Sequence, residues 1–170
     1  MTKPENAEYD AYYGGYISLA DENDLLGSLS AQPAELAQML DGLSDERGSY
    51  AYQEDKWTIK EVVGHLIDGE RMFAYRILRI SRGDTTPIEG FEQDGYIENA
   101  HSNGRQMADL LEEFRLLREA NLFLLKNLKE EDWVRMGTAS GLPISVRALA
   151  YIMSGHITHH VNILKTRYLA

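Results

Sequence analysis

Apolar side chains recur at helical spacing in four separate stretches of the chain. The first covers residues 24–43, the second 58–82 and the third 105–128, and the fourth begins at Ser145 and continues to the C-terminus. In each stretch apolar residues return every three or four positions, the period that places them on one face of an α-helix. No segment shows the apolar and polar alternation of a convincing strand. We therefore predict an all-α fold, a four-helix bundle.

Local signals predict where these helices begin. Thr58 and Glu61 have the spacing of a capping box, and Ser145 can cap the fourth helix. In the first stretch Ser30 precedes Pro33, and proline is favoured in the first turn of a helix. We therefore expect the first helix to be broken in two.

Two segments lie outside the predicted helices. Residues 83–103 contain turn-forming Gly, Pro and Asn residues without a regular period, so they should form a long loop between the second and third helices. A loop of that length is often functional, and it allows the helices that it joins to run parallel. Residues 1–20 carry four tyrosines among polar residues, and we expect an extended arm without helix. All 170 residues should form a single domain, 1–170.

Composition narrows the classes of partner and of chemistry. The net charge of −10 would repel a phosphate backbone, so nucleic acid is not expected as a partner. The N-terminus lacks a signal-peptide pattern, and the longest apolar run falls far short of the about 20 residues that cross a bilayer. We expect a cytoplasmic protein without a membrane partner. Because the chain has no cysteine, any bound metal must have nitrogen and oxygen ligands.

The segment GHITHHVNIL, residues 155–164, contains three of the five histidines. His156 and His160 lie four positions apart on the same stripe as Leu149 and Met153, so both should point into the bundle. Side chains at this spacing start roughly 5 to 6 Å apart at Cβ, which lets two imidazoles converge on one ion. His159 lies one position off this stripe, at its edge.

A third ligand must come from another helix, and His65 qualifies because it lies on the apolar face of the second helix. Both His65 and His156 follow a glycine, Gly64 and Gly155, and a glycine inside a helix usually has a packing reason. We expect a close approach of the second and fourth helices there. A single inward histidine is more often a hydrogen-bonded core residue. Three that can converge favour a metal site.

The ligand set also limits the chemistry. HITHH has Ile157 where the HExxH motif of zinc peptidases has its general-base glutamate, which disfavours that mechanism. Three neutral imidazoles leave a coordination position for water or substrate, as at a reactive ion. They do not choose among zinc, nickel, iron and manganese. His101 lies in the long loop, as an exposed residue or a loop anchor.

Other residues could contact a substrate or carry protons. Arg71 or Arg76 on the second helix could bind substrate, and Asp94 and Tyr96 in the long loop could transfer protons or form a lid. Simpler interpretations exist for each: an ion pair or surface role for the arginine, and loop packing for the other two. Asp68 and Glu70 flank the ligand stripe and could orient a ligand imidazole by accepting its other N–H, but we interpret them first as solvated residues.

The sequence resembles the DinB / YfiT-like superfamily of metal-dependent enzymes over about residues 20–168. The specific part is the spacing of His65 from His156 and His160. The resemblance implies a four-helix bundle in which these histidines bind zinc or nickel, commonly in a homodimer. Relatives often carry a glutamate after the first histidine of the last-helix motif, and Ile157 departs from this. The remaining matches are Trp57, ERMFAYRILRISRGD at 70–84, Pro87, Gly90, Phe91, Asp94, Tyr96 and GHITHHVNIL.

Two kinds of function are compatible with these residues. The first is a metal-dependent enzyme acting on a small molecule, either a hydrolase or a transferase. The resemblance implies that such a transferase would use a low-molecular-weight thiol such as bacillithiol or mycothiol. The alternative is a non-catalytic structural or stress-associated interaction module in which the ion only joins two helices. A structural ion would have a fourth protein ligand, whereas an enzyme would keep an open position beside a pocket.

Overall fold

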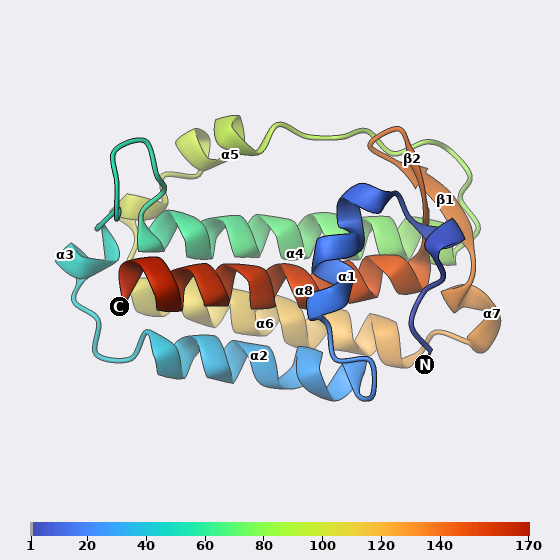
Figure 1. Cartoon of the computed structure of the whole chain (residues 1–170), viewed down its shortest axis with the longest axis horizontal. Helices are drawn as coiled ribbons and strands as arrows, with labels where there is room; N and C mark the ends of the chain where they lie inside the picture. The colour runs from blue at the N-terminus through green and yellow to red at the C-terminus, as the bar shows by residue number, and fades with distance from the viewer. Residues whose placement is uncertain (1) are drawn as a thin grey trace.

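Four long helices form a bundle in the computed structural model, which describes residues 2–170 (Figure 1). They are α2 (Leu25–Met39), α4 (Ile59–Ser81), α6 (Met107–Lys126) and α8 (Val146–Ile163). Helix α4 packs against α6 and α8, and α2 packs against the same two helices. The predicted all-α four-helix bundle is confirmed.

The helices α4 and α6 run in the same direction. The chain between them returns along the length of the molecule and carries the short helix α5 (Gln93–Ala100) (Figure 1). The parallel arrangement agrees with the prediction from the long loop. The loop is less irregular than expected, because it also contains a 3-10 turn at Ser102–Gly104. Two further one-turn helices, α3 (Asp45–Gly48) and α7 (Glu130–Trp133), lie in other connections.

The first bundle helix is continuous, and the expected break at Ser30 is wrong. Asp24 caps α2, accepting a hydrogen bond from the amide of Gly27 at 2.9 Å. Pro33 lies inside this helix and has no N–H to donate to the carbonyl of Leu29. That carbonyl accepts a hydrogen bond of 2.9 Å from Nη1 of Arg118 instead. A partner from another helix thus satisfies the group that the proline leaves free.

The caps of α4 and α8 agree with the sequence. Thr58 accepts from the amide of Glu61 at 3.1 Å, and the Glu61 carboxylate accepts from the amide of Thr58 at 2.7 Å. Ser145 accepts from the amide of Ala148 at 3.0 Å. The last turn of α8 continues into a π-helix, Leu164–Tyr168. None of the helices within residues 2–170 has the length and apolar character that crossing a membrane requires.

A β-hairpin precedes α8, so the expectation of no strand is wrong. Strand β1 (Met136–Ala139) pairs antiparallel with β2 (Leu142–Ser145). The two turn residues, Ser140 and Gly141, both have positive φ angles, 53° and 77°. Two-residue hairpin turns require this conformation, and it favours a small residue followed by glycine. The strands are only four residues long, so their alternation is a weak signal.

The N-terminal segment is helical where we expected an extended arm. Two 3-10 turns, Asn6–Glu8 and Ala11–Tyr13, lead into α1 (Gly14–Leu19), which crosses α8 (Figure 1). Its Ile17 is fully buried in the core. A Cβ atom on Gly155 would lie 1.8 Å from the carbonyl oxygen of Tyr16. The glycine in α8 therefore makes room for the backbone of α1.

The core consists of two apolar clusters. One contains Ile77, Ile80 and the residues 148–153, and the other contains Val62, Val63, Leu66 and Ile157. On α4 and α8 the buried residues of the two clusters are separated by positions 68–76 and 154–156, and buried polar side chains lie at this junction. The polar side chains at the junction are Gln32, Glu70, Arg118, Ser154 and His156, and those of His65 and His160 lie next to it, among positions of the second cluster.

Candidate metal centre

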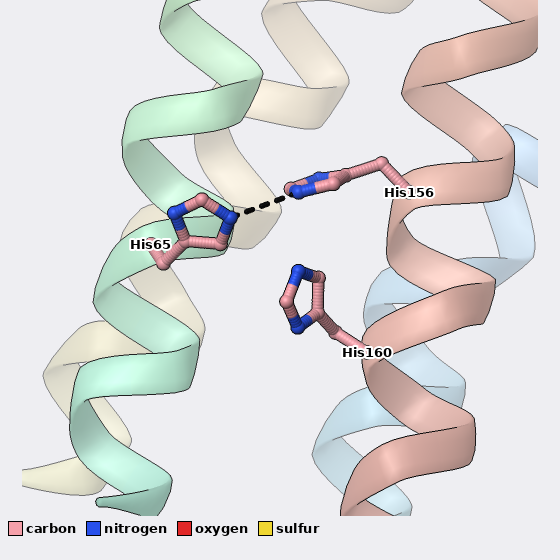
Figure 2. Close-up of side chains that lie close together, drawn as sticks. All are labelled: His65, His156 and His160. Carbon is pink, nitrogen blue, oxygen red and sulfur yellow. Dashed lines mark hydrogen bonds between the residues drawn. The ribbon is translucent and has the colours of Figure 1, made fainter. Parts of the chain in front are cut away.

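Three histidines from two helices meet between α4 and α8. His65 comes from α4, and His156 and His160 lie one turn apart on α8. Each is less than 9 % exposed, and one nitrogen from each ring lies within 4.8 Å of the others (Figure 2). The Nε2 atoms of His65 and His156 are 2.9 Å apart. Two imidazole nitrogens bound to one tetrahedral zinc lie about 3.3 Å apart, so this group has the dimensions of a metal site.

One glycine makes room for a histidine of this group, but it is not one of the two that the sequence indicated. A Cβ atom on Gly64 would lie 2.2 Å from Oγ of Ser102, and that on Gly155 would meet α1. We had predicted that both glycines allow a close approach of α4 to α8, and neither does. Gly69 on α4 is the glycine that makes room for α8, because a Cβ atom there would lie 3.1 Å from Cε1 of His156.

Burial keeps the three imidazoles neutral. Desolvation lowers the pKa of His65 to about 4, although the charge of Asp94 opposes this shift. Desolvation and the neighbouring His65 and His159 lower the pKa of His160 to about 3. The pKa of His156 lies well below its usual range, mainly because the ring is buried. At neutral pH all three rings therefore have the protonation state that binds metal ions.

A buried polar network adjoins the histidines, and the sequence analysis missed it. Glu70 is 1 % exposed, and its carboxylate accepts two hydrogen bonds of 2.7 Å from Nε and Nη2 of Arg118. Arg118 also donates to Gln32 at 2.8 Å, and Gln32 donates to the carbonyl of Ser154 at 2.9 Å. The network thus joins all four bundle helices. Our interpretation of Glu70 as a solvated residue is wrong, because a partner 48 positions away compensates its charge.

A cavity of about 470 Å³ opens onto the histidine group. His65 and His156 form part of its lining, and Gly69, Phe73 and Arg76 follow along α4. Positions 65, 69 and 76 lie on one face of the helix. Three side chains of the N-terminal segment, Tyr12, Tyr13 and Tyr16, complete the lining together with residues of the hairpin and of the long connection. Tyrosines of the segment that we expected to form an extended arm therefore line this cavity.

The candidate catalytic residues have different surroundings. Arg76 is 3 % exposed and lines the cavity, whereas Arg71 is exposed and pairs with Glu113. Asp94 is exposed on α5 and lines a second cavity together with His160 and Trp57. Tyr96 is 46 % exposed, and its ring lies 5.0 Å from that of Phe91. A catalytic role for Arg76, Asp94 and Tyr96 stays a prediction.

The remaining histidines lie outside the group. His159 is half-buried at the edge of the stripe, with its ring 5.4 Å from that of Tyr16. His101 is exposed at the end of α5, with a positive φ angle of 51°. Ile157 is 2 % exposed and packs in an apolar cluster. A carboxylate at position 157 would be buried among apolar side chains, which explains why this position holds isoleucine here.

Comparisons with known proteins agree with this arrangement. The sequence of residues 28–164 matches the family model of the DinB superfamily. A protein of Geobacillus thermodenitrificans, named as a candidate metal-dependent hydrolase, is 24 % identical over 152 residues, which cover 86 % of this chain and 85 % of the relative. A protein of Oceanobacillus iheyensis with a similar name is 24 % identical over 88 residues, 51 % of this chain and 50 % of the relative.

A solved structure has the same fold. YfiT from Bacillus subtilis, described as a candidate metal-dependent hydrolase with an unusual four-helix bundle topology, superimposes with a TM-score of 0.77. The match covers 96 % of this chain and 89 % of YfiT, with 19 % sequence identity. The topology of the bundle is therefore shared even though few residues are.

Proposed function

Because the chain belongs to the DinB superfamily, we propose that it is a metal-dependent hydrolase whose ion is bound by His65, His156 and His160. The observation that carries this proposal is the convergence of three buried, neutral imidazoles beside a cavity of about 470 Å³. Zinc or nickel suits a site made of nitrogen ligands without sulfur. The candidate hydrolase names of the two relatives support the same reaction class.

The ligand set favours an enzyme over a structural module. Among residues 2–170 the group contains three histidines and no fourth histidine or carboxylate. A divalent ion held by three imidazoles supplies a Lewis acid that activates water or a thiol near neutral pH. The cavity beside His65 and His156 gives a small molecule access to this position. The non-catalytic module remains the alternative, and it would show metal binding without turnover.

The chain's own residues would orient the reactants. Trp57 packs against His65, with ring centroids 4.8 Å apart, and helps to exclude water from that side of the group. Asp94 lines the cavity that also contains His160, so its carboxylate is the candidate to accept a proton at Oδ. It would fill the role that the peptidase motif gives to a glutamate at position 157. Asp94→Asn should lower kcat without changing metal content, and Glu98→Gln on the same helix is the matched control.

Metal analysis tests the proposal directly. Protein purified without a metal-affinity tag should contain a single divalent ion per chain. His160→Ala should lose this ion, because only two of the three imidazole ligands would remain. His159→Gln should keep the ion, since His159 is the neighbouring histidine outside the group. Equal metal content in the wild-type protein and His160→Ala would remove the basis for the site.

Activity assays separate hydrolysis from thiol transfer, the second reaction that the family resemblance implies. A panel of carboxylic esters, amides and phosphate esters should reveal metal-dependent hydrolysis. Conjugation of bacillithiol or glutathione to monochlorobimane would instead indicate a thiol transferase. The absence of turnover in both panels, with a fully loaded site, would favour the structural module.

The assembly and location of the protein stay predictions. The resemblance implies a homodimer, and the chain mass of 19.3 kDa would then appear doubled in size-exclusion chromatography with light scattering. A cytoplasmic location is likewise a proposal, which cell fractionation would test.

A further inference from the structure

One buried charge in the cavity lacks the partner that its surroundings require. Arg76 is 3 % exposed, and no carboxylate within residues 2–170 lies at ion-pair distance from its guanidinium. Its Nη2 donates two hydrogen bonds, one to Oγ of Ser140 at 2.9 Å and one to the carbonyl of Glu89 at 3.5 Å, and the Tyr13 side chain also faces the guanidinium. Its Nε is buried without a hydrogen-bond acceptor. An unpaired charge and an unused donor are both costly inside a protein.

Arg118 shows what a fully paired arginine looks like in this fold. It is equally buried, yet Glu70 neutralises it with two hydrogen bonds, and Gln32 and the Leu29 carbonyl accept from Nη1. The chain has 27 acidic and 17 basic residues, so carboxylates are not scarce. A carboxylate that lines the cavity, Glu92, is exposed and forms no ion pair with Arg76 within the described chain. The anion that Arg76 requires is therefore not supplied by nearby protein groups.

The cavity connects Arg76 to the histidine group. Arg76 follows His65 by 11 positions on α4, which is three turns on the same face and about 16 Å along the helix axis. Gly69 and Phe73 line the cavity between them, and the Tyr16 ring lies 5.5 Å from that of His156. A ligand that spans this distance would meet a cation at one end, an apolar and aromatic middle, and the metal ligands at the other end.

We propose that Arg76 binds a carboxylate group of the substrate, so that an apolar or aromatic body lies over Phe73 and the reacting bond lies at the histidines. This assignment deepens the proposed function and depends on it for the reaction, but not for the binding. The planar guanidinium suits a carboxylate, which would accept hydrogen bonds from Nε and from a second N–H. The substrate class is thus a small amphipathic carboxylic acid with its scissile bond remote from the acid.

Binding of 4-phenylbutanoate and of its neutral amide tests the proposal by calorimetry. The acid and the amide have the same apolar body and differ in charge. Each is titrated into the protein as purified and into the protein after chelation, because a carboxylate could also bind a metal ion. We expect the acid to bind both forms at least about tenfold more tightly than the amide.

Two arginine variants separate the site from general electrostatics. Arg76→Gln should weaken binding of the acid at least about tenfold and leave binding of the amide unchanged. Arg71→Gln removes the same charge from an exposed position on the same helix and should bind both ligands like the wild-type protein. Arg76→Lys keeps a cation and should retain part of the preference for the acid. Circular dichroism establishes that each variant is folded.

The outcomes also distinguish this proposal from the proposed function. Equal affinity for acid and amide, or no binding of either by the wild-type protein, would overturn the role of Arg76 and needs no variant to be seen. Preference for the acid that disappears on chelation and survives in Arg76→Gln would place the carboxylate on the metal, which also overturns it. A metal-free protein that still binds the acid through Arg76 would support this site even if no hydrolysis were found.

Discussion

The buried charge of Arg118 depends on partners from distant parts of the chain. Arg118 lies on α6, and its partners Glu70 and Gln32 lie on α4 and α2. Removing a single member of such a group leaves the other charge buried without compensation. The resulting loss of folding free energy exceeds the stabilisation that the intact pair provides. Arg118 also faces the histidine group closely enough for its charge to lower the pKa of His156. The network therefore supports the side chains that form the site.

Arg118→Met should lower the free energy of unfolding by about 3–5 kcal/mol, because Glu70 would remain buried and unpaired. Urea denaturation followed by circular dichroism measures this change. Arg115→Met is the matched control, since Arg115 lies on the same helix and forms exposed ion pairs with Glu112 and Glu119. Adding Glu70→Gln to Arg118→Met should recover part of the loss, because the buried charge is then removed. Equal losses for Arg118→Met and Arg115→Met would contradict this account.

The elements differ in how well local sequence predicts them. Helices α4 and α8 begin where capping residues stand, because a cap acts on amides only two or three positions away. Helix α2 passes through Pro33 because Arg118 from another helix satisfies the freed carbonyl. Helix α1 has only six residues, too few for a reliable period, and it is held by contact with α8. Short elements therefore escaped prediction.

Gly155→Ala tests how α1 is held. The new Cβ would overlap the Tyr16 carbonyl, and because that atom is backbone the whole of α1 must move. We expect a loss of about 1–3 kcal/mol in the free energy of unfolding, as for other overpacked sites. Amide hydrogen exchange in α1 should become faster. Gly15→Ala is the control, since a Cβ atom at Gly15 has open space around it, and unchanged exchange in Gly155→Ala would show that the close approach is unimportant.

The whole bundle has a polar junction between two apolar clusters. His156 lies at this junction with the Glu70 and Arg118 pair, and His65 and His160 lie next to it, among positions of the second cluster. Such a layer interrupts the core, so its groups must be satisfied by one another, by a bound ion or by solvent in the cavity. In the metal-free protein the histidines must remain neutral for this arrangement to hold. The stability of the entire fold is then linked to pH.

The metal-free protein should lose stability as the pH falls from about 6.5 to about 4. The pKa of His65 is lowered from 6.5 to about 4 on folding, so the unfolded chain binds protons more readily in this range. Its contribution is complete above pH 6.5 and is lost as the pH falls toward the folded-state pKa, by about 3 kcal/mol for this residue alone. Urea titrations at several pH values after chelation measure the loss.

His65→Gln should reduce this dependence on pH, because the residue can no longer be protonated. His101→Gln, at an exposed loop position, should keep the wild-type profile. A profile that is flat between pH 6.5 and 4 in the wild-type protein would show that the buried rings do not control its acid stability.

Helical periodicity is encoded by neighbouring residues, and for that reason the number of long helices, two of their caps and the inward direction of His156 and His160 follow from the sequence. The pairing of His65 with them was also predictable, because three histidines on apolar faces have few other ways to be satisfied. The contacts between elements were not, since they join positions far apart in the chain. Burial of Glu70 with Arg118, the seating of α1 on Gly155 and the unpaired state of Arg76 all depend on which faces of the bundle meet, and a linear pattern does not contain that information.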